Sequence, residues 1–287
     1  MRSVTTSAAI LVGAILCASD SHDPATAQPV AGSPVLAELV SEVRGIRPGT
    51  PFWLGVRLVT SDGWHVNWVN PGDAGLAPEI EWALPEGFAA GEIQWPLPRR
   101  HDISGLAIFG YEGDVILMCR VTPPDELPTG KDIAVRAGVT WLACREACVP
   151  GEADLSLTLP VIPAADRDDF DTRWKEAFAR SREEIPTPVR EWRFKATAAG
   201  DRLVIEATPP KNTTTGLAGV AFFPFRQGII ENSAPQTLTR DGSVYRLELR
   251  RDRMNPEAPA RLGGVLVSEN GWGDRRHKAV EIDVPVD

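Results

Sequence analysis

Turn-forming residues divide this chain into short segments, and this feature restricts its possible folds more than any other. Gly and Pro each occur 25 times in 287 residues, which favours many turns over long helices. Between the turns lie short runs with β patterning, among them residues 52–59, 64–69 and 115–121. Asn70-Pro71-Gly72-Asp73 is a turn signal between such runs. Strands of this length and spacing predict an antiparallel β-sandwich.

The patterning changes twice along the chain, which predicts two β domains joined by a helix and a linker. We assign residues 28–163 to the first sandwich. In residues 164–188, four apolar side chains recur at helical spacing before two prolines, so we expect a short amphipathic helix that packs on a domain face; the four are Phe170, Trp174, Ala177 and Phe178. Residues 189–287 return to β patterning and predict a second β-sandwich. Its candidate strands are 203–207, 220–225, 245–249 and 262–267.

Residues 1–27 have the features of an export signal peptide. A weakly basic start precedes an apolar stretch from Ala8 to Ala18, and Ala25-Thr26-Ala27 offers a cleavage site. A cut after Ala18 is the alternative. Cys17 would be discarded with the signal, because the residues before it fit a lipid-anchoring cysteine poorly. No later segment reaches the roughly 18 apolar residues that span a bilayer, so we expect an exported, periplasmic chain without stable membrane insertion.

The charge balance is acidic. The chain has 39 acidic and 30 basic residues and a net charge of −9. Loss of residues 1–27, which hold Arg2, Asp20 and Asp23, would leave a net charge of −8. This balance argues against nucleic acid or anionic lipid as a partner. Residues 189–287 contain no catalytic triad, Gly-rich phosphate loop or metal-binding spacing, so we expect no cofactor.

Cys144 and Cys148 form the constellation with the most evident chemistry. Residues 139–143 predict a strand and residues 145–147 a tight turn, so the two cysteines would face each other at the mouth of a hairpin, within reach of a disulfide. Closing so short a loop removes little unfolded-state entropy, and local, accessible pairs tend to be labile or catalytic. On spacing alone, a structural disulfide remains an equal alternative. A zinc site would need four ligands, and no second pair of ligands accompanies the two cysteines.

Cys119 and His65 also need an interpretation. Cys119 shares a predicted strand face with the apolar residues Val115, Leu117 and Val121. We therefore expect a buried free thiol rather than a third redox cysteine. His65 lies beside Trp64 and Trp68 in the sequence. A copper site needs several soft or imidazole ligands, and the three Met and four His are not clustered. We therefore interpret His65 as structural.

Several residue strings together resemble the periplasmic N-terminal domain of the DsbD and ScsB thiol:disulfide interchange proteins, most nearly a stand-alone member of the ScsB-like branch. The resemblance covers roughly residues 35–165, and residues 189–287 resemble the longer N-terminal region of that branch only loosely. The strings that carry it are 64–76, 81–88, 93–96, 109–113 and 141–153. The better-known branch of the family has a longer insert between its cysteines.

The resemblance implies an immunoglobulin-like β-sandwich and a protein-disulfide oxidoreductase domain with Cys144 and Cys148 as the catalytic pair. It implies a membrane DsbD/ScsB-type or thioredoxin-like electron donor and a periplasmic disulfide isomerase-like acceptor. We expect the donor to be a separate protein, because no transmembrane or thioredoxin-like module is evident. By position, Phe109 and Tyr111 are candidates for a cap that shields the pair. The match of Cys148-x-Pro150 implies that Cys148 forms the mixed disulfide and that Cys144 resolves it.

Two other functions stay open. A Trp-rich β-sandwich with a structural disulfide could be a non-enzymatic binding module for carbohydrate or peptides. The ScsB-like branch is also associated with copper tolerance, so a periplasmic copper-handling protein that uses Cys144 and Cys148 as soft ligands is the other alternative. The reduction potential of the pair separates a structural bridge from an electron relay.

Overall fold

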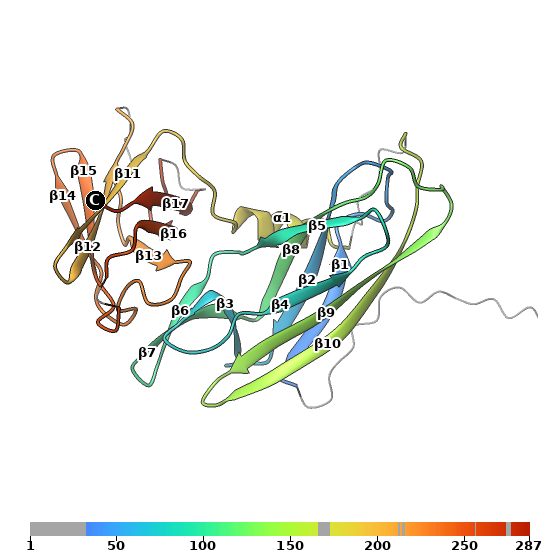
Figure 1. Ribbon diagram of the computed structural model, residues 1–287, viewed down its shortest axis with the longest axis horizontal. Coiled ribbons are helices and arrows are strands. Elements are labelled where there is room, and N and C mark those ends of the chain that lie inside the picture. The colour runs from blue at the N-terminus through green and yellow to red at the C-terminus, as the bar shows by residue number, and fades with distance from the viewer. Residues whose placement is uncertain (1–32, 166–172, 212, 214–215, 256, 274–276) are drawn as a thin grey trace, which may run out of the picture.

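The computed structural model describes residues 33–287 apart from 166–172, 212, 214–215, 256 and 274–276. The predicted signal peptide, residues 1–27, and Phe170 of the predicted helix lie outside the described residues. Strands dominate the described part of the chain, and a single short helix, α1, stands between two groups of sheets (Figure 1). The predicted all-β, immunoglobulin-like class is confirmed.

The first group consists of two antiparallel sheets. One has the order β1-β2-β8-β5, with the strands β1 (Val35–Ser41), β2 (Phe52–Thr60), β8 (Asp114–Thr122) and β5 (Ala89–Gln94). The other has the order β10-β9-β3-β7-β6, and β4 pairs with β9 beside this path. Its strands are β3 (His65–Gly72), β4 (Glu79–Ala83), β6 (Arg99–Ile103), β7 (Leu106–Glu112), β9 (Asp132–Cys144) and β10 (Cys148–Pro160).

The two sheets share one apolar core, because each strand directs alternate side chains inward. In β10, Leu155, Leu157 and Leu159 are buried, whereas Ser156 and Thr158 between them are exposed. The same alternation places side chains from both sheets in a single cluster, for example Val56 and Leu58 from β2 and Val66 and Trp68 from β3. This is the sandwich that the Gly/Pro-punctuated pattern predicts.

The helix α1 (Lys175–Glu183) covers the outer face of the β1-β2-β8-β5 sheet. Its Phe178 is fully buried against Val40, Ile116 and Met118, which point away from the sandwich core. Arg182 in the last turn pairs with the buried carboxylate of Glu42 on the adjoining segment. The expected helix on a domain face is therefore confirmed, and it explains why both faces of β8 are apolar.

The second half has two smaller sheets and a core of its own, as the predicted second sandwich requires. One sheet has the order β11-β12-β15-β14, with β11 (Arg193–Ala199), β12 (Arg202–Thr208), β15 (Val244–Arg250) and β14 (Thr237–Asp241). The other has the order β13-β16-β17, with β13 (Ala221–Pro224), β16 (Arg261–Val267) and β17 (Ala279–Pro285). The four predicted strands fall on β12, β13, β15 and β16. The exact domain boundaries remain a proposal.

Aromatic side chains join the two halves. Phe223 on β13 belongs to the core of the first sandwich rather than to that of the second. Its ring centroid lies 5.0 Å from that of Phe109 and 6.3 Å from that of Trp68. The ring of Phe225 lies 5.6 Å from that of Trp68. The apolar surface buried in this way stabilises a fixed arrangement of the two halves.

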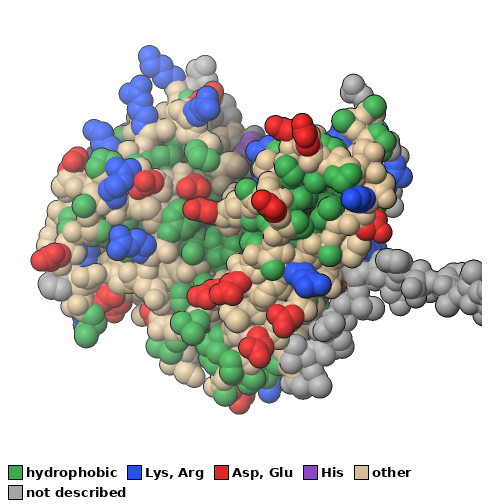
Figure 2. Space-filling model, turned by 45° about the vertical axis from the view of Figure 1, so that its right-hand side comes forward, with side chains coloured by type: hydrophobic (Ala, Val, Ile, Leu, Met, Phe, Trp, Pro, Cys, Tyr) green, Lys and Arg blue, Asp and Glu red, His purple; other side chains and the backbone are tan. Residues whose placement is uncertain are grey.

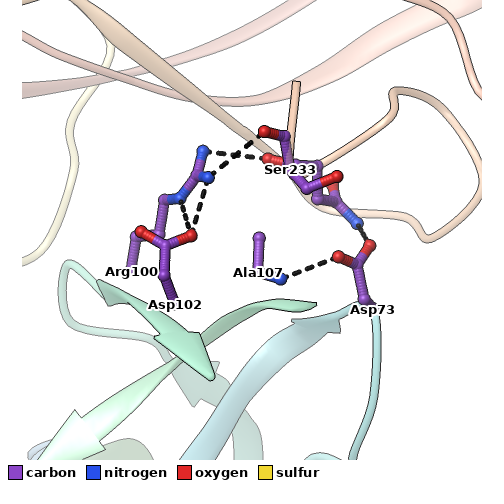
Figure 3. Close-up of polar contacts among 6 residues, drawn as sticks. Asp73, Arg100, Asp102, Ala107 and Ser233 are labelled. Atoms are coloured by element: carbon purple, nitrogen blue, oxygen red, sulfur yellow. Dashed lines mark hydrogen bonds and ion pairs between the residues drawn. The ribbon is translucent and has the colours of Figure 1, made fainter. Parts of the chain in front are cut away.

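Hydrogen bonds surround this aromatic contact. The buried Asn70 donates to the carbonyl of Pro224 over 2.7 Å. Asn232 donates to Asp73 over 2.9 Å, and Asp73 in turn accepts from the backbone N–H of Ala107 (Figure 3). Arg100 is held by Asp102 and donates to the carbonyl of Asn232 over 2.9 Å. Figure 3 draws Asp73, Arg100, Asp102 and Ala107 from the first half together with Ser233 from the second half.

The turn predicted at residues 70–73 begins later in the structure than the sequence pattern indicates. β3 continues to Gly72, and its pairing with β7 is irregular after Asn67. Gly72 has a φ of 83°, and a Cβ there would meet the carbonyl oxygen of Ala107 at 2.2 Å. The Asn-Pro-Gly-Asp string has the composition of an exposed turn. Its polar side chains, however, form hydrogen bonds with the second half rather than with solvent.

The surface carries charges of both signs. On the face drawn in Figure 2, acidic and basic side chains of the described residues are both present, and several basic ones lie close together at the upper left. No helix within the described ranges is long and apolar enough to cross a membrane.

Candidate functional site

The cysteine pair lies where the sequence predicts it. Cys144 is the last residue of β9 and Cys148 the first of β10, and the two are opposite each other in the antiparallel register. They form a disulfide, with Cα atoms 4.0 Å apart. The three residues between them form the turn, in which Arg145 N–H donates to the carbonyl of Ala147. The local hairpin brings the sulfurs together without any help from distant parts of the chain.

The two cysteines differ in access. Cys144 is only 5% exposed, whereas Cys148 is exposed together with Val149 and Pro150. β10 is also the outer strand of its sheet, and within the described residues no strand pairs with its other side. An incoming sulfur can therefore approach Cys148 directly. It can reach Cys144 only after local movement, because Cys144 is buried. Since access is one of the factors that set exchange rates, Cys148 should react first.

A histidine lies next to the buried cysteine. His65, at the start of β3, is the direct register partner of Cys144 on one side and of Glu112 on the other. Its ring stacks on that of His101 from β6, with centroids 5.4 Å apart and 12° between the planes. Burial first, and then the neighbouring His101, lowers the pKa of His65, while Glu112 opposes the shift. His65 is therefore a neutral imidazole at neutral pH.

His101 and Glu112 form the outer part of this cluster. His101 Nδ1 lies 3.2 Å from a carboxylate oxygen of Glu112. His101 Nε2 is buried and has no hydrogen-bond partner among the described residues. The sequence pattern does not single out either residue, and it relates His65 only to its neighbours Trp64 and Trp68. The charge-bearing side chains of His101 and Glu112 become neighbours of Cys144 only through the pairing of β9, β3, β7 and β6.

The turn itself is anchored to the preceding connection. The guanidinium of Arg145 lies 5.2 Å from the ring centroid of Trp64, a cation–π geometry. Trp64 lies between β2 and β3 and directly precedes His65. This contact fixes the turn beside the histidine cluster. In the disulfide form the Arg145 charge thus has an aromatic partner.

The two proposed cap residues, Phe109 and Tyr111, are in the interior. Both lie on β7 and are buried in the core shared by the two sheets. Tyr111 donates its hydroxyl hydrogen to the carbonyl of Pro96 over 2.7 Å, and Phe109 packs on Phe223. In the strand register, Tyr111 is aligned with Val66 and Ala143, one position from Cys144, so its side chain points to the opposite face. Their role as a cap stays a prediction.

Cys119 is confirmed as a buried free thiol. It is fully inaccessible on β8, opposite Leu54 and Ile93. Burial raises its pKa to about 11, against a smaller opposing effect of the hydrogen bond with Trp82. Because the thiolate is the nucleophile, this residue should be inert at neutral pH.

Alkylation of the reduced protein should therefore separate Cys119 from the pair. In the folded chain without residues 1–27 at pH 8, we expect mass spectrometry after iodoacetamide treatment to show labels at Cys148 and Cys144 before any at Cys119. A pKa of about 11 leaves roughly one thiol in a thousand ionised at that pH. A third label should appear only after unfolding in denaturant. Equally fast labelling of Cys119 in the folded protein would contradict the prediction.

The described residues hold no group of three or more His, Cys, Asp or Glu side chains placed to bind a metal ion. An open hollow of about 600 Å³ occurs in the second half, with Trp192, Lys211 and Trp272 in its lining. It does not include the cysteines or their histidine neighbours.

Comparison with known proteins agrees with this chemistry. Residues 37–160 match a family described as thiol:disulfide interchange protein DsbD, N-terminal. The N-terminal periplasmic domain of ScsB from Proteus mirabilis has a similar structure, with a TM-score of 0.63 and 14% identity over 90% of this chain and 96% of that one. At this identity the likeness shows the fold, and its coverage extends over both halves.

Other solved structures are much less similar. A protein of unknown function from Porphyromonas gingivalis W83 has a TM-score of 0.24 and 13% identity over 89% of this chain and 100% of its own. The E. coli chaperone DraB has a TM-score of 0.21 and 13% identity over 86% and 96%. No curated protein matches the sequence. Residues 37–160 are therefore similar to the N-terminal domain of the DsbD thiol:disulfide interchange proteins, and the likeness to the ScsB domain shows a shared fold.

Proposed function

We propose that this chain is a periplasmic electron relay in which the Cys144–Cys148 pair exchanges with the disulfides of other proteins. The observation that carries the proposal is the asymmetric disulfide at the hairpin mouth, with Cys148 exposed and Cys144 buried. One sulfur is thus accessible to a partner, and the second is protected until the first has reacted. This division suits a pair that forms a mixed disulfide and then resolves it.

The structural alternative has less physical support. β9 and β10 pair along thirteen residues each, from Cys144 and Cys148 to Asp132 and Pro160. The disulfide joins two residues that this hairpin already holds together. A bridge that closes so short a loop restricts the unfolded chain little. Its contribution to stability is therefore small, and reversible redox chemistry is the better account of the pair.

The surface next to Cys148 supports a protein partner. Val149 is 40% exposed and Pro150 is exposed beside it, on an outer strand. We propose a thioredoxin-like or membrane DsbD/ScsB-type protein as the electron donor and a periplasmic disulfide isomerase-like protein as the acceptor. A disulfide also fits the oxidising periplasm, to which the predicted signal peptide would direct the chain.

We also propose that Phe109 and Tyr111 protect the pair indirectly. Both hold β7 in place, Phe109 through Phe223 and Tyr111 through Pro96. β7 carries Glu112, which lies beside His65 and binds His101. The two aromatic residues would thus keep a covering layer of side chains next to Cys144.

The reduction potential tests the relay directly. We expect the pair to equilibrate with glutathione buffers at a potential above about −300 mV, the range below which structural disulfides fall. Acid quenching, alkylation and mass spectrometry give the reduced fraction in each buffer, with Cys119→Ala as the background so that two thiols are counted. A reduced thioredoxin-like protein should also open the bond.

A potential well below −300 mV together with no exchange would contradict the relay. That result would assign the disulfide a structural role and favour the binding-module alternative. Cu(I) uptake by the reduced protein that is lost in Cys144→Ser would instead favour the copper-handling alternative.

A further inference from the structure

Three ionisable side chains from separate strands lie side by side at the cysteine pair. Cys144, His65 and Glu112 are direct register partners across β9, β3 and β7. Directly opposed residues of antiparallel strands direct their side chains to the same face, with Cβ atoms about 4.5–5.5 Å apart. The imidazole of His65 is therefore adjacent to the sulfur of Cys144, and the carboxylate of Glu112 lies beyond it.

The second histidine completes the cluster from a fourth strand. His101 stacks on His65 and approaches Glu112 within 3.2 Å. The titratable or charged groups that face His65 from neighbouring strands are thus His101 from β6 and Glu112 from β7, and Arg145 and Glu146 lie in the turn after Cys144. Arg145 is directed at the ring of Trp64. The polar cluster is almost fully covered on the side of His65, which is only 2% exposed.

We infer that His65 accepts the proton of the Cys144 thiol when Cys144 resolves a mixed disulfide at Cys148. The inference deepens the proposed function and rests on it. His65 would act on a reacting group, whereas His101 and Glu112 would act through His65 as positioning residues. Cys144 needs an internal base because its burial keeps hydroxide and buffer bases away, and the thiolate is the nucleophile in exchange.

The pair reduces a partner disulfide in two exchange steps. The Cys148 thiolate attacks a partner disulfide, bonds to one partner sulfur and releases the other as a thiolate, which takes a proton from water. His65 then removes the proton from Cys144, and the Cys144 thiolate attacks the sulfur of Cys148. The Cys144–Cys148 bond forms, the bond to the partner breaks, and the second partner thiolate takes the proton from the His65 imidazolium. Two electrons thus pass from the pair to the partner disulfide.

The environment of His65 suits a base. Burial and His101 lower its pKa, so the ring is neutral and has a free lone pair at neutral pH. Glu112 stabilises the imidazolium for the short time that it exists, since it opposes the downward shift of the pKa. Because the pKa of His65 is lowered from the ordinary value of 6.5, protonation should remove the base and slow the resolving step only at a pH lower than that value.

A two-phase reaction with one equivalent of 4,4′-dithiodipyridine tests this inference. The reduced Cys119→Ala protein should release one coloured thiopyridone as Cys148 reacts and a second as Cys144 resolves. In His65→Gln the second phase should be about thirtyfold slower at pH 7, because only about 3% of a thiol with a pKa near 8.5 is ionised there. Its rate should then rise about tenfold per pH unit, whereas the unaltered protein should show a plateau above neutral pH.

The controls separate this inference from the proposed function. His277→Gln, an exposed histidine in the second half, should leave both phases unchanged. The reagent is a small disulfide, so the second phase can be measured even if no protein partner exchanges with the pair. A His65→Gln second phase with the rate and pH profile of the unaltered protein would overturn the role of His65, whatever the result for the relay.

A measurement on the unaltered chain covers the case in which His65→Gln does not fold. The His65 ring signals can be titrated by NMR in the oxidised and the reduced protein. We expect a lower His65 pKa in the reduced protein, because the Cys144 thiol can donate a hydrogen bond to the neutral ring and the disulfide cannot. Equal pKa values in the two redox states would show that the ring does not sense the Cys144 sulfur and would overturn the inference.

Discussion

Cys148→Ser is expected to abolish mixed disulfides with partner proteins, whereas Cys144→Ser should make them accumulate. Cys148 is exposed on an outer strand, and Cys144 is 5% exposed beneath the turn. Only the first can meet a partner sulfur without local opening. When Cys144 is absent, the mixed disulfide at Cys148 has no internal thiol to resolve it. The yield of trapped complex should therefore differ between the two variants by more than about tenfold, because access governs which sulfur reacts.

The measurement is a non-reducing gel of periplasmic extract after acid quenching and alkylation, followed by mass spectrometry of the trapped bands. Both variants should carry Cys119→Ala, so that the remaining free thiol cannot form complexes. The Cys144→Ser/Cys148→Ser double variant gives the background. The opposite pattern, with complexes at Cys144 and none at Cys148, would reverse the assignment of the attacking and resolving sulfurs.

The parts of the site that the sequence predicts correctly depend on local structure. Cys144 and Cys148 are four residues apart, so strand patterning on both sides of a three-residue turn is enough to place them opposite each other. The helix that contains Phe178 likewise follows from spacing within a few turns. Burial of Cys119 follows from its place on the same strand face as the apolar Val115 and Leu117, within a stretch of β8 that is buried on both faces.

The missed parts depend on pairing between distant segments. His65 meets Cys144 only because β3 pairs with β9, and His101 and Glu112 join them because β7 and β6 extend the same sheet. A single sequence gives the inward and outward positions of each strand, but not which strands become neighbours. The histidines are separated in the sequence, so no spacing motif reveals their stacking.

The sequence also does not predict the contact between the two halves. The Asn70–Asp73 string has turn composition, yet its polar groups bind the second half. Strand alternation predicts that Phe222 and Phe223 face opposite sides of β13, but not which core receives each ring. In the structure, Phe222 lies in the core of the second half and Phe223 in that of the first. This division allows the contact to be tested with neighbouring residues.

Phe223→Ala should destabilise the first sandwich although the residue belongs to the second half. Removal of a buried Phe ring from a core costs about 3–5 kcal/mol, and this ring packs on Phe109 and near Trp68. We expect hydrogen exchange, followed by mass spectrometry, to become faster in peptides from β3 and β7 as well as in β13. β3 carries His65 and β7 carries Glu112. Faster exchange in these strands would show that the second half stabilises the strands that hold the redox site.

Phe222→Ala is the matched control, because it removes the same side chain from the adjacent position. Phe222 is fully buried in the core of the second half, so its loss should cost a similar free energy but increase exchange mainly in that half. If Phe223→Ala left the exchange of β3 and β7 unchanged, the aromatic contact would not couple the halves. If it increased their exchange as expected, the second half is a structural support for strands of the cysteine site, and its deletion should disturb His65 even though it holds no cysteine.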